Sequence, residues 1–189
     1  TTMKPIYSLW VVICAMMLCM PVSAQDTTTS KDDEKYIKKL TRLAKRPKNV
    51  EEQYQLAECY FNGDHVVQSY VDAAIWYGVA AENGHASAQN DYGICYYNGL
   101  GVDKNNQEAV KWFMRAANQG LASAQFNLGY CYEYGYGIEK NYSKSVIWYR
   151  KSANQGHTEA QYHLADCLYL GNGTAQDYVE AVKWYGLAA

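Results

Sequence analysis

Four cysteines are the residues of this sequence with the clearest capacity for chemistry. They recur every 36 residues, at Cys59, Cys95, Cys131 and Cys167. This spacing excludes a zinc site, because zinc ligands cluster in short motifs such as two cysteines separated by two residues. It also excludes disulfides between equivalent positions, because stacked helices hold their Cα atoms farther apart than the ~7 Å that a disulfide allows. We therefore expect four free, buried thiols that pack as small apolar side chains.

The histidines and carboxylates form no recognisable catalytic set. His85 and His157 occupy equivalent positions of the 36-residue period, but the copy between them has Leu121, so no chemistry common to all copies requires the imidazole. His65 falls in a predicted loop, and His163 is the one histidine on a helix face that merits attention as a site residue. The sequence therefore predicts no catalytic residue, no metal site and no cofactor, although a site can also assemble across repeats.

The same period organises the chain from residue 52 onward. Tryptophan and glycine follow it as well, at Trp76, Trp112, Trp148 and Trp184, at Gly63, Gly99, Gly135 and Gly171, and at Gly84, Gly120 and Gly156. A period of this length is typical of a solenoid, in which each repeat is one supersecondary unit. We define four repeats, at residues 52–87, 88–123, 124–159 and 160–189.

Each repeat has the pattern of two helices joined by a glycine turn. In the third repeat, Ala124, Leu128 and Cys131 lie on one helical face, and Gly135 ends that helix. The second helices are expected to begin after the N-cap residues Ser69, Asn105, Asn141 and Asp177, and to end before the second glycine series. The tryptophans are assigned to the core of these second helices. The predicted fold is all-α, an α/α solenoid of four tandem 36-residue helix-turn-helix repeats.

The residues that carry the period also carry a resemblance to a known family. The matching pattern consists of Ala124, Leu128-Gly129, Tyr132, Gly135-x-Gly137-Ile138, Trp148 and Ala153 through Gly156. It resembles the Sel-one-like repeat, a branch of the tetratricopeptide-like α-solenoids, over residues 52–189. Ala57 and Ala165 replace the glycine inside the first helix, and His65 replaces the second loop glycine of the first copy.

The resemblance implies an adaptor that binds a protein or peptide and has no enzymatic activity. It also leaves an alternative, because some exported, cysteine-rich members of the family resemble penicillin-binding β-lactamases. An intermediate possibility is a protein that binds cell-wall peptides without turnover. Those members have a disulfide within each repeat, whereas this chain has a single cysteine per repeat, so that pattern does not carry over.

Residues 1–24 have the order of a cleavable signal peptide. Lys4 precedes an apolar run from about Leu9 to Met20, and Val22-Ser23-Ala24 supplies small residues before Gln25. The apolar run is too short to span a bilayer, which requires ~20 apolar residues. We therefore expect cleavage after Ala24 and an exported protein, periplasmic or secreted, of bacterial type.

The mature chain has a basic start and an acidic body. From Lys31 to Lys48 there are eight Lys/Arg against three Asp/Glu, a balance of +5, whereas from Asn49 onward eight face fifteen, a balance of −7. An acidic body disfavours binding to a nucleic acid backbone.

The basic segment is in phase with the second helices of the repeats. The register places Asp33 at an N-cap and turns Leu40 and Ala44 inward, so residues 25–48 are predicted to form a polar linker and a capping helix from Asp33 to Arg46. The alternative role for its basic side is contact with an anionic membrane surface.

An excess of aromatic residues on the first helices indicates a binding surface. Core residues occupy positions 1, 5, 8 and 9 of each repeat, so positions 3, 7, 10 and 11 point away and would ordinarily be charged. Eight of them are aromatic instead: Tyr54, Phe61, Tyr97, Phe126, Tyr130, Tyr134, Tyr162 and Tyr169. Exposed aromatic surface typically marks a contact site. We predict that these rings line a concave groove, with coverage by neighbouring helices as the alternative.

The last repeat stops short of a full period. Around Trp184, Leu187 and Ala188 it has an apolar flank that no following repeat covers. From this pattern we expect either a longer array or self-association through the last repeat.

Overall fold

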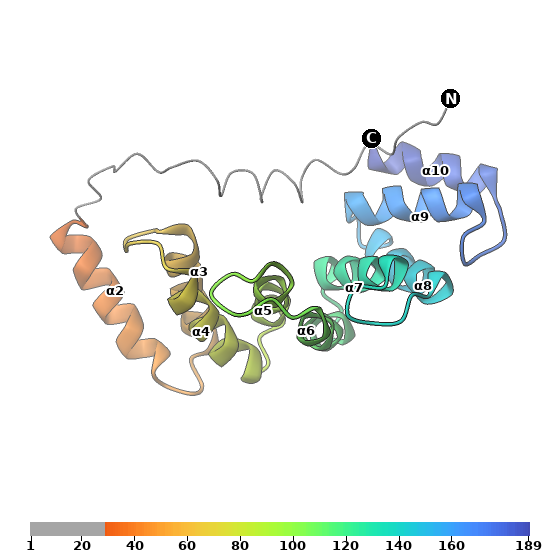
Figure 1. Cartoon of the computed structure of the whole chain (residues 1–189). Coiled ribbons are helices and arrows are strands. Elements are labelled where there is room, and N and C mark those ends of the chain that lie inside the picture. The colour runs from red at the N-terminus through yellow and green to blue at the C-terminus, as the bar shows by residue number, and fades with distance from the viewer. Residues whose placement is uncertain (1–28) are drawn as a thin grey trace, which may run out of the picture.

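The computed structural model describes residues 29–189, which contain helices and no strand (Figure 1). The helices are α2 (Lys31–Ala44), α3 (Val50–Asn62), α4 (Tyr70–Glu82), α5 (Ala86–Asn98), α6 (Asn106–Asn118), α7 (Ala122–Tyr134), α8 (Tyr142–Ala153), α9 (Thr158–Leu170) and α10 (Tyr178–Ala188). The predicted signal peptide, residues 1–24, lies outside the described residues. Within the described part, no helix combines the length and the apolar character needed to cross a membrane.

The helices stack in chain order, and this confirms the predicted all-α solenoid. Each helix packs mainly on the helix before it and the helix after it, from α2 through α10. Figure 1 shows the stack as an arc with the first helices of the repeats, α3, α5, α7 and α9, along its inner side. We call this inner side, which faces away from the second helices, the concave face.

Local hydrogen bonds fix the helix ends where the sequence predicted them. The side chains of Ser69, Asn105, Asn141 and Asp177 each accept a backbone N–H in the first turn of α4, α6, α8 and α10. The first helices end at glycines with left-handed φ, for example Gly135 at 77°. These contacts depend on residues within one helical turn, which explains why the sequence pattern located them.

In the last three repeats, a second loop glycine packs directly against the preceding repeat. Gly137 has a φ of 70°, and a Cβ built on it would lie only 2.1 Å from the carbonyl oxygen of Asn106, at the start of α6. Gly101 and Gly173 make the same close approach to Tyr70 and Tyr142. The glycine therefore serves both the left-handed turn and the contact between repeats.

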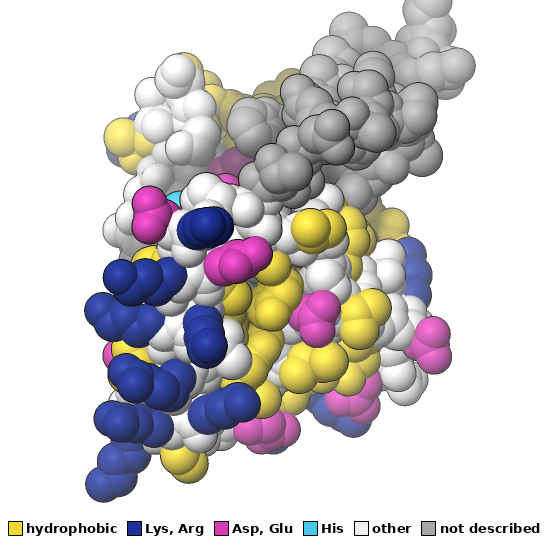
Figure 2. Space-filling view, turned by 90° about the vertical axis from the view of Figure 1, so that its left-hand side faces the viewer, with side chains coloured by type: hydrophobic (Ala, Val, Ile, Leu, Met, Phe, Trp, Pro, Cys, Tyr) yellow, Lys and Arg dark blue, Asp and Glu magenta, His cyan; other side chains and the backbone are white. Residues whose placement is uncertain are grey.

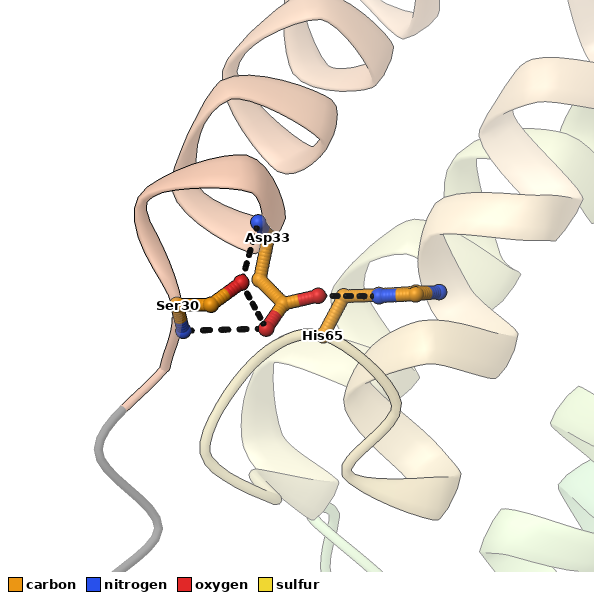
Figure 3. Close-up of polar contacts among 3 residues, drawn as sticks. All are labelled: Ser30, Asp33 and His65. Carbon is orange, nitrogen blue, oxygen red and sulfur yellow. Dashed lines mark hydrogen bonds and ion pairs between the residues drawn. The ribbon is translucent and has the colours of Figure 1, made fainter.

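The first repeat has His65 at this position, with a left-handed φ of 62°. Its Nδ1 lies 2.5 Å from Oδ1 of Asp33, so a side chain joins the loop to α2 where the later repeats use backbone contact (Figure 3). The hydrogen bonds from His65 and Ser30 lower the pKa of Asp33 to about 2.

The capping helix begins earlier than predicted. Its N-cap is Ser30, not Asp33, because Ser30 and Asp33 cap each other reciprocally and add most of a turn to the helix. Leu40 and Ala44 are buried against the first repeat as predicted. Figure 2 shows Lys and Arg side chains gathered on the outer surface at this end of the molecule.

The four repeat tryptophans were all assigned to the core, and the structure confirms this for one of them. Trp112 is buried, whereas Trp76, Trp148 and Trp184 are half-buried. The residue after the tryptophan is buried more deeply in the first three repeats, as Tyr77, Phe113 and Tyr149. Adjacent residues of a helix point about 100° apart, so only one of the two can face the first helix of its own repeat directly. The three half-buried tryptophans consequently lie at the edge of the core.

We expect Gly137→Ala to destabilise the protein more than Gly156→Ala. Both glycines have left-handed φ, 70° and 86°, so alanine costs about 1–2 kcal/mol at either site. Only Gly137 also faces a backbone oxygen, since nothing lies within 4 Å of a Cβ at Gly156. Urea unfolding should show an additional loss of about 1–3 kcal/mol for Gly137→Ala. Equal losses would contradict the role of this glycine in the contact between repeats.

Candidate functional site

The eight aromatic residues predicted to line a groove divide into two groups. Tyr134, Tyr162 and Tyr169 are exposed, at 44%, 51% and 51%. The other five are half-buried and pack partly on the core: Tyr54, Phe61, Tyr97, Phe126 and Tyr130. Neighbouring repeats therefore cover much of the second group, while the first group offers free ring surface.

The rings form one connected cluster at the junction of the second and third repeats. The Tyr130 and Tyr134 ring centroids are 4.5 Å apart, and Tyr136 stacks on Tyr134 at 5.8 Å. Tyr136 also meets the edge of Tyr97 at 5.8 Å, so it joins the two repeats. In the sequence pattern, Tyr136 is the residue between the turn glycines Gly135 and Gly137, and it is not one of the eight predicted groove residues. Its position two residues beyond Tyr134, between two glycines, was the available signal.

Histidine rings extend this cluster toward the fourth repeat. His157 stacks on Phe126 with centroids 5.0 Å apart, and His163 lies 5.5 Å from the same ring. His163 Nδ1 is 3.2 Å from Oε2 of Glu133. The first repeat has an equivalent stack of Tyr54 on His85, at 4.5 Å. His163, the one histidine that the sequence singles out, therefore lies on the concave face where α9 contacts α7.

A chain of hydrogen bonds runs along the concave face between repeats. The Tyr54 hydroxyl donates to Asp91 at 3.0 Å, the Asn90 amide donates to Asp91 at 3.0 Å, and the Asn127 amide donates to Asn90 at 2.9 Å. Asp91, Asn127 and His163 all occupy position 4 of their repeats. Position 4 is not one of the outward positions predicted from the sequence. The helical angle of position 4 lies close to that of positions 7 and 11, which was the missed signal.

Tyrosine hydroxyls of the second helices donate hydrogen bonds to carboxylates of the concave face. Tyr77 donates to Glu58, Tyr185 donates to Asp166, and Tyr149 donates to Glu133 at 2.6 Å. Burial and the adjacent carboxylates raise the pKa of all three tyrosines above its usual value. The second repeat replaces both partners with apolar residues, Phe113 and Ile94. The core and the concave face therefore share hydrogen bonds in three of the four repeats.

The concave face lacks cationic side chains of its own. Helices α3, α5, α7 and α9 contain no Lys or Arg, and all eight Lys/Arg after Asn49 fall on second helices or loops. The carboxylates of this face thus have tyrosine, asparagine and histidine as partners. Burial raises the pKa of Asp91 to about 6, although its hydrogen bonds with Asn90 and Tyr54 act in the opposite direction.

The cysteines lie away from this face, in the core. Cys59, Cys95, Cys131 and Cys167 are all buried and free, as their spacing predicted. Burial raises the pKa of Cys95, Cys131 and Cys167 to about 12 and also raises that of Cys59. Among the described residues, no group of three or more His, Cys, Asp or Glu is arranged to hold a metal ion. The concave face instead presents aromatic rings and hydrogen-bond acceptors, which suits recognition of another chain.

We expect four slowly reacting thiols in the mature protein. The thiolate is the reactive form, and burial suppresses both its formation and its access to reagent. Titration with a thiol reagent under non-reducing conditions should therefore give four thiols after denaturation and very slow reaction before it. Two or no thiols after denaturation would reveal disulfides and contradict the assignment, and fast reaction of the folded protein would contradict their burial.

Comparison with known proteins places this architecture in a family. The Sel1 repeat profile matches residues 53–85, 86–121, 122–157 and 158–189. The chain is similar to the solved structure of a Sel1 repeat protein from Oxalobacter formigenes, with 32% identity and a TM-score of 0.77, over 82% of this chain and 61% of that one. It is also similar to c5321, a protective antigen of uropathogenic Escherichia coli strains with an SLR fold, with 33% identity and a TM-score of 0.48, over 87% of this chain and 43% of that one.

The chain thus spans 61% of the Oxalobacter protein and 43% of the antigen. No curated protein matches it significantly. The match of four consecutive repeats covers most of the sequence, and the solved relative with a TM-score of 0.77 has the same fold. On these grounds the chain belongs to the Sel1 repeat family.

Proposed function

We propose that this protein is a non-enzymatic scaffold that binds a protein or peptide segment on its concave face. A Sel1 repeat solenoid is an architecture consistent with protein–protein interaction. The observation that carries the proposal is the set of exposed tyrosines on the first helices, Tyr134, Tyr162 and Tyr169, beside a connected cluster of half-buried rings. Tyrosine provides a large rigid contact area and a hydroxyl group at a low entropic cost, which favours its use in binding surfaces.

The charge of the concave face specifies the chemistry of the bound segment. The helices of this face carry no Lys or Arg. They carry four carboxylates that take part in its hydrogen bonds: Glu58, Asp91, Glu133 and Asp166. A segment with basic side chains would therefore meet complementary charge, and its cations could also lie over tyrosine rings. We propose an extended or helical segment with both basic and apolar residues as the partner.

The proposed location of this scaffold is outside the cytoplasm, in the periplasm or the medium of a bacterium. The support is the order of Lys4, the apolar run and Val22-Ser23-Ala24 in the sequence. Expression of the chain from its Met3 in a bacterium, followed by fractionation, tests this location. We expect the exported form to begin at Gln25, as read by N-terminal sequencing. An uncleaved protein that stays in the cytoplasm would contradict the proposal.

The binding face is tested with peptides selected from a displayed random library. We expect Tyr134→Ala combined with Tyr162→Ala to weaken the selected peptides by about tenfold or more, because exposed aromatic residues dominate the binding energy of such surfaces. The matched control is Ile147→Ala, which removes an exposed apolar side chain (55% exposed) from second helix α8.

Thermal unfolding of both variants distinguishes binding from folding. Because Tyr134 and Tyr162 are exposed, we expect little loss of stability from their replacement. Unchanged affinity of the double variant would refute the concave face as the binding site. A large loss of stability would show that these rings belong to the core.

A further inference from the structure

A surface cavity lies on the other side of the array, away from the concave face. It has a volume of about 610 Å³ and lies where α4, α5 and α6 meet. Tyr92, Tyr96 and Trp112 provide its aromatic lining, and Glu82 and Glu108 line it as well. The ring centroid of Tyr92 is 4.9 Å from that of Tyr96 and 5.2 Å from that of Trp112. Arg115 of the same chain lies over the Trp112 ring at 4.3 Å, so it is the rings of Tyr92 and Tyr96, next to Glu108, that have the composition of a further cation-binding site.

The third repeat places a cation of its own over the ring that is equivalent to Tyr96. Between the second and third repeats, Lys144 holds the position that Glu108 holds here, and its ammonium lies 5.4 Å from the ring centroid of Tyr132. Tyr132 in turn is the equivalent of Tyr96, one period later. At that junction the aromatic surface is therefore already occupied by a lysine of the same chain.

The junction between the third and fourth repeats has leucines, Leu164 and Leu168, in place of Tyr92 and Tyr96, but it pairs an arginine with the equivalent carboxylate. Arg150 pairs with Glu180, which also accepts a hydrogen bond from the indole of Trp184 at 3.1 Å. Glu180 is the equivalent of Glu108, and Arg150 is the equivalent of Gly78. The first junction thus keeps the carboxylate of the fourth repeat but has glycine in place of the arginine.

The carboxylates of the cavity are not strongly engaged elsewhere. Glu108 meets Lys111 at 2.5 Å and Glu82 meets Arg115 at 3.2 Å, but all four side chains are at least 36% exposed. Surface pairs of this kind contribute little free energy, so they do not prevent Glu108 or Glu82 from accepting another cation.

We propose that this cavity binds an arginine side chain of a partner protein. The guanidinium would lie over the rings of Tyr92 and Tyr96 and pair with Glu108, where Arg150 pairs with Glu180 in the last repeat. The site is on a different face from the peptide surface proposed above and stands independently of it.

An apolar stripe beside the cavity supports a macromolecular partner. Val71, Ile75 and Val79 follow one another at four-residue spacing on α4 and are 58%, 56% and 38% exposed. The equivalent residues of α6 are Gln107, Lys111 and Arg115. Ile75 and Val79 also line the cavity. An arginine inserted into the cavity would therefore bring its own chain against adjacent apolar surface, which in a soluble protein typically marks a contact site.

The test uses a charged probe and its neutral isostere on the mature chain. Nα-acetyl-arginine amide and Nα-acetyl-citrulline amide are titrated against ¹⁵N-labelled protein, and the indole N–H resonance of Trp112, assigned with Trp112→Phe, reports binding. We expect the arginine probe to shift this resonance with an affinity about tenfold higher than that of citrulline, the factor that a free-energy difference of about 1.4 kcal/mol produces.

The decisive variant is Glu108→Lys, which copies the residue that the third repeat already accommodates. We expect it to fold normally and to weaken the arginine probe by about tenfold or more, because its own lysine removes the carboxylate and occupies the rings. Glu139→Lys, which makes the same charge change on an exposed loop residue, is the control and should retain binding. The proposal is overturned if arginine gives no shift at Trp112, if citrulline binds equally well, or if Glu108→Lys binds like wild type.

Discussion

The stacking of the array depends on one buried glutamine in each repeat. The Gln89 side-chain nitrogen donates to the carbonyl oxygen of Ala81 at 3.0 Å, and its oxygen accepts from Gln119 at 2.7 Å. The last carbonyls of a helix have no partner within it, and a buried amide without partners costs about 1–3 kcal/mol. The amide is satisfied only when three helices meet in one arrangement. Gln53, Gln125 and Gln161 make the corresponding bond to the preceding helix.

This arrangement brings the core and the concave face into direct contact. Each first helix approaches its second helix closely through a small residue, as at Gly129, where a Cβ would lie 2.7 Å from the ring of Tyr149. The ring can therefore pass across the core and place its hydroxyl 2.6 Å from Glu133 on the other side. Because such hydrogen bonds hold the carboxylates in place, the proposed binding surface is organised before any partner arrives.

The array also separates its charges between surfaces. The first helices carry carboxylates and rings without Lys or Arg, whereas cations of the second helices lie over tryptophan, as Arg115 does on Trp112 at 4.3 Å. The outer side of α2 adds a third, strongly basic surface (Figure 2). The chain therefore presents three surfaces of different chemistry, and contact of the basic surface with an anionic membrane stays the alternative to its role as a cap.

The sequence by itself determined the repeat, the helices and their ends. N-caps such as Asn141 and turn glycines such as Gly135 act within one helical turn, so their spacing along the chain reveals them directly. It also identified the buried cysteines, because a small apolar residue repeated in phase with the core belongs to it. The start of the capping helix at Ser30 was not predicted, because the repeat register points to Asp33 and the reciprocal cap between Ser30 and Asp33 begins the helix three residues earlier.

Only the tertiary structure decided which side chains meet across the repeats. Tyr149 reaches Glu133 from 16 residues away, and Tyr54 reaches Asp91 from 37, so no local pattern links either pair. How closely two helices pack likewise decides that Tyr149 is buried more deeply than the adjacent Trp148. The cavity between α4, α5 and α6 follows the same rule, because its lining residues come from three helices, and the absence of a side chain at Gly78 lets the Tyr92 ring pack directly on α4.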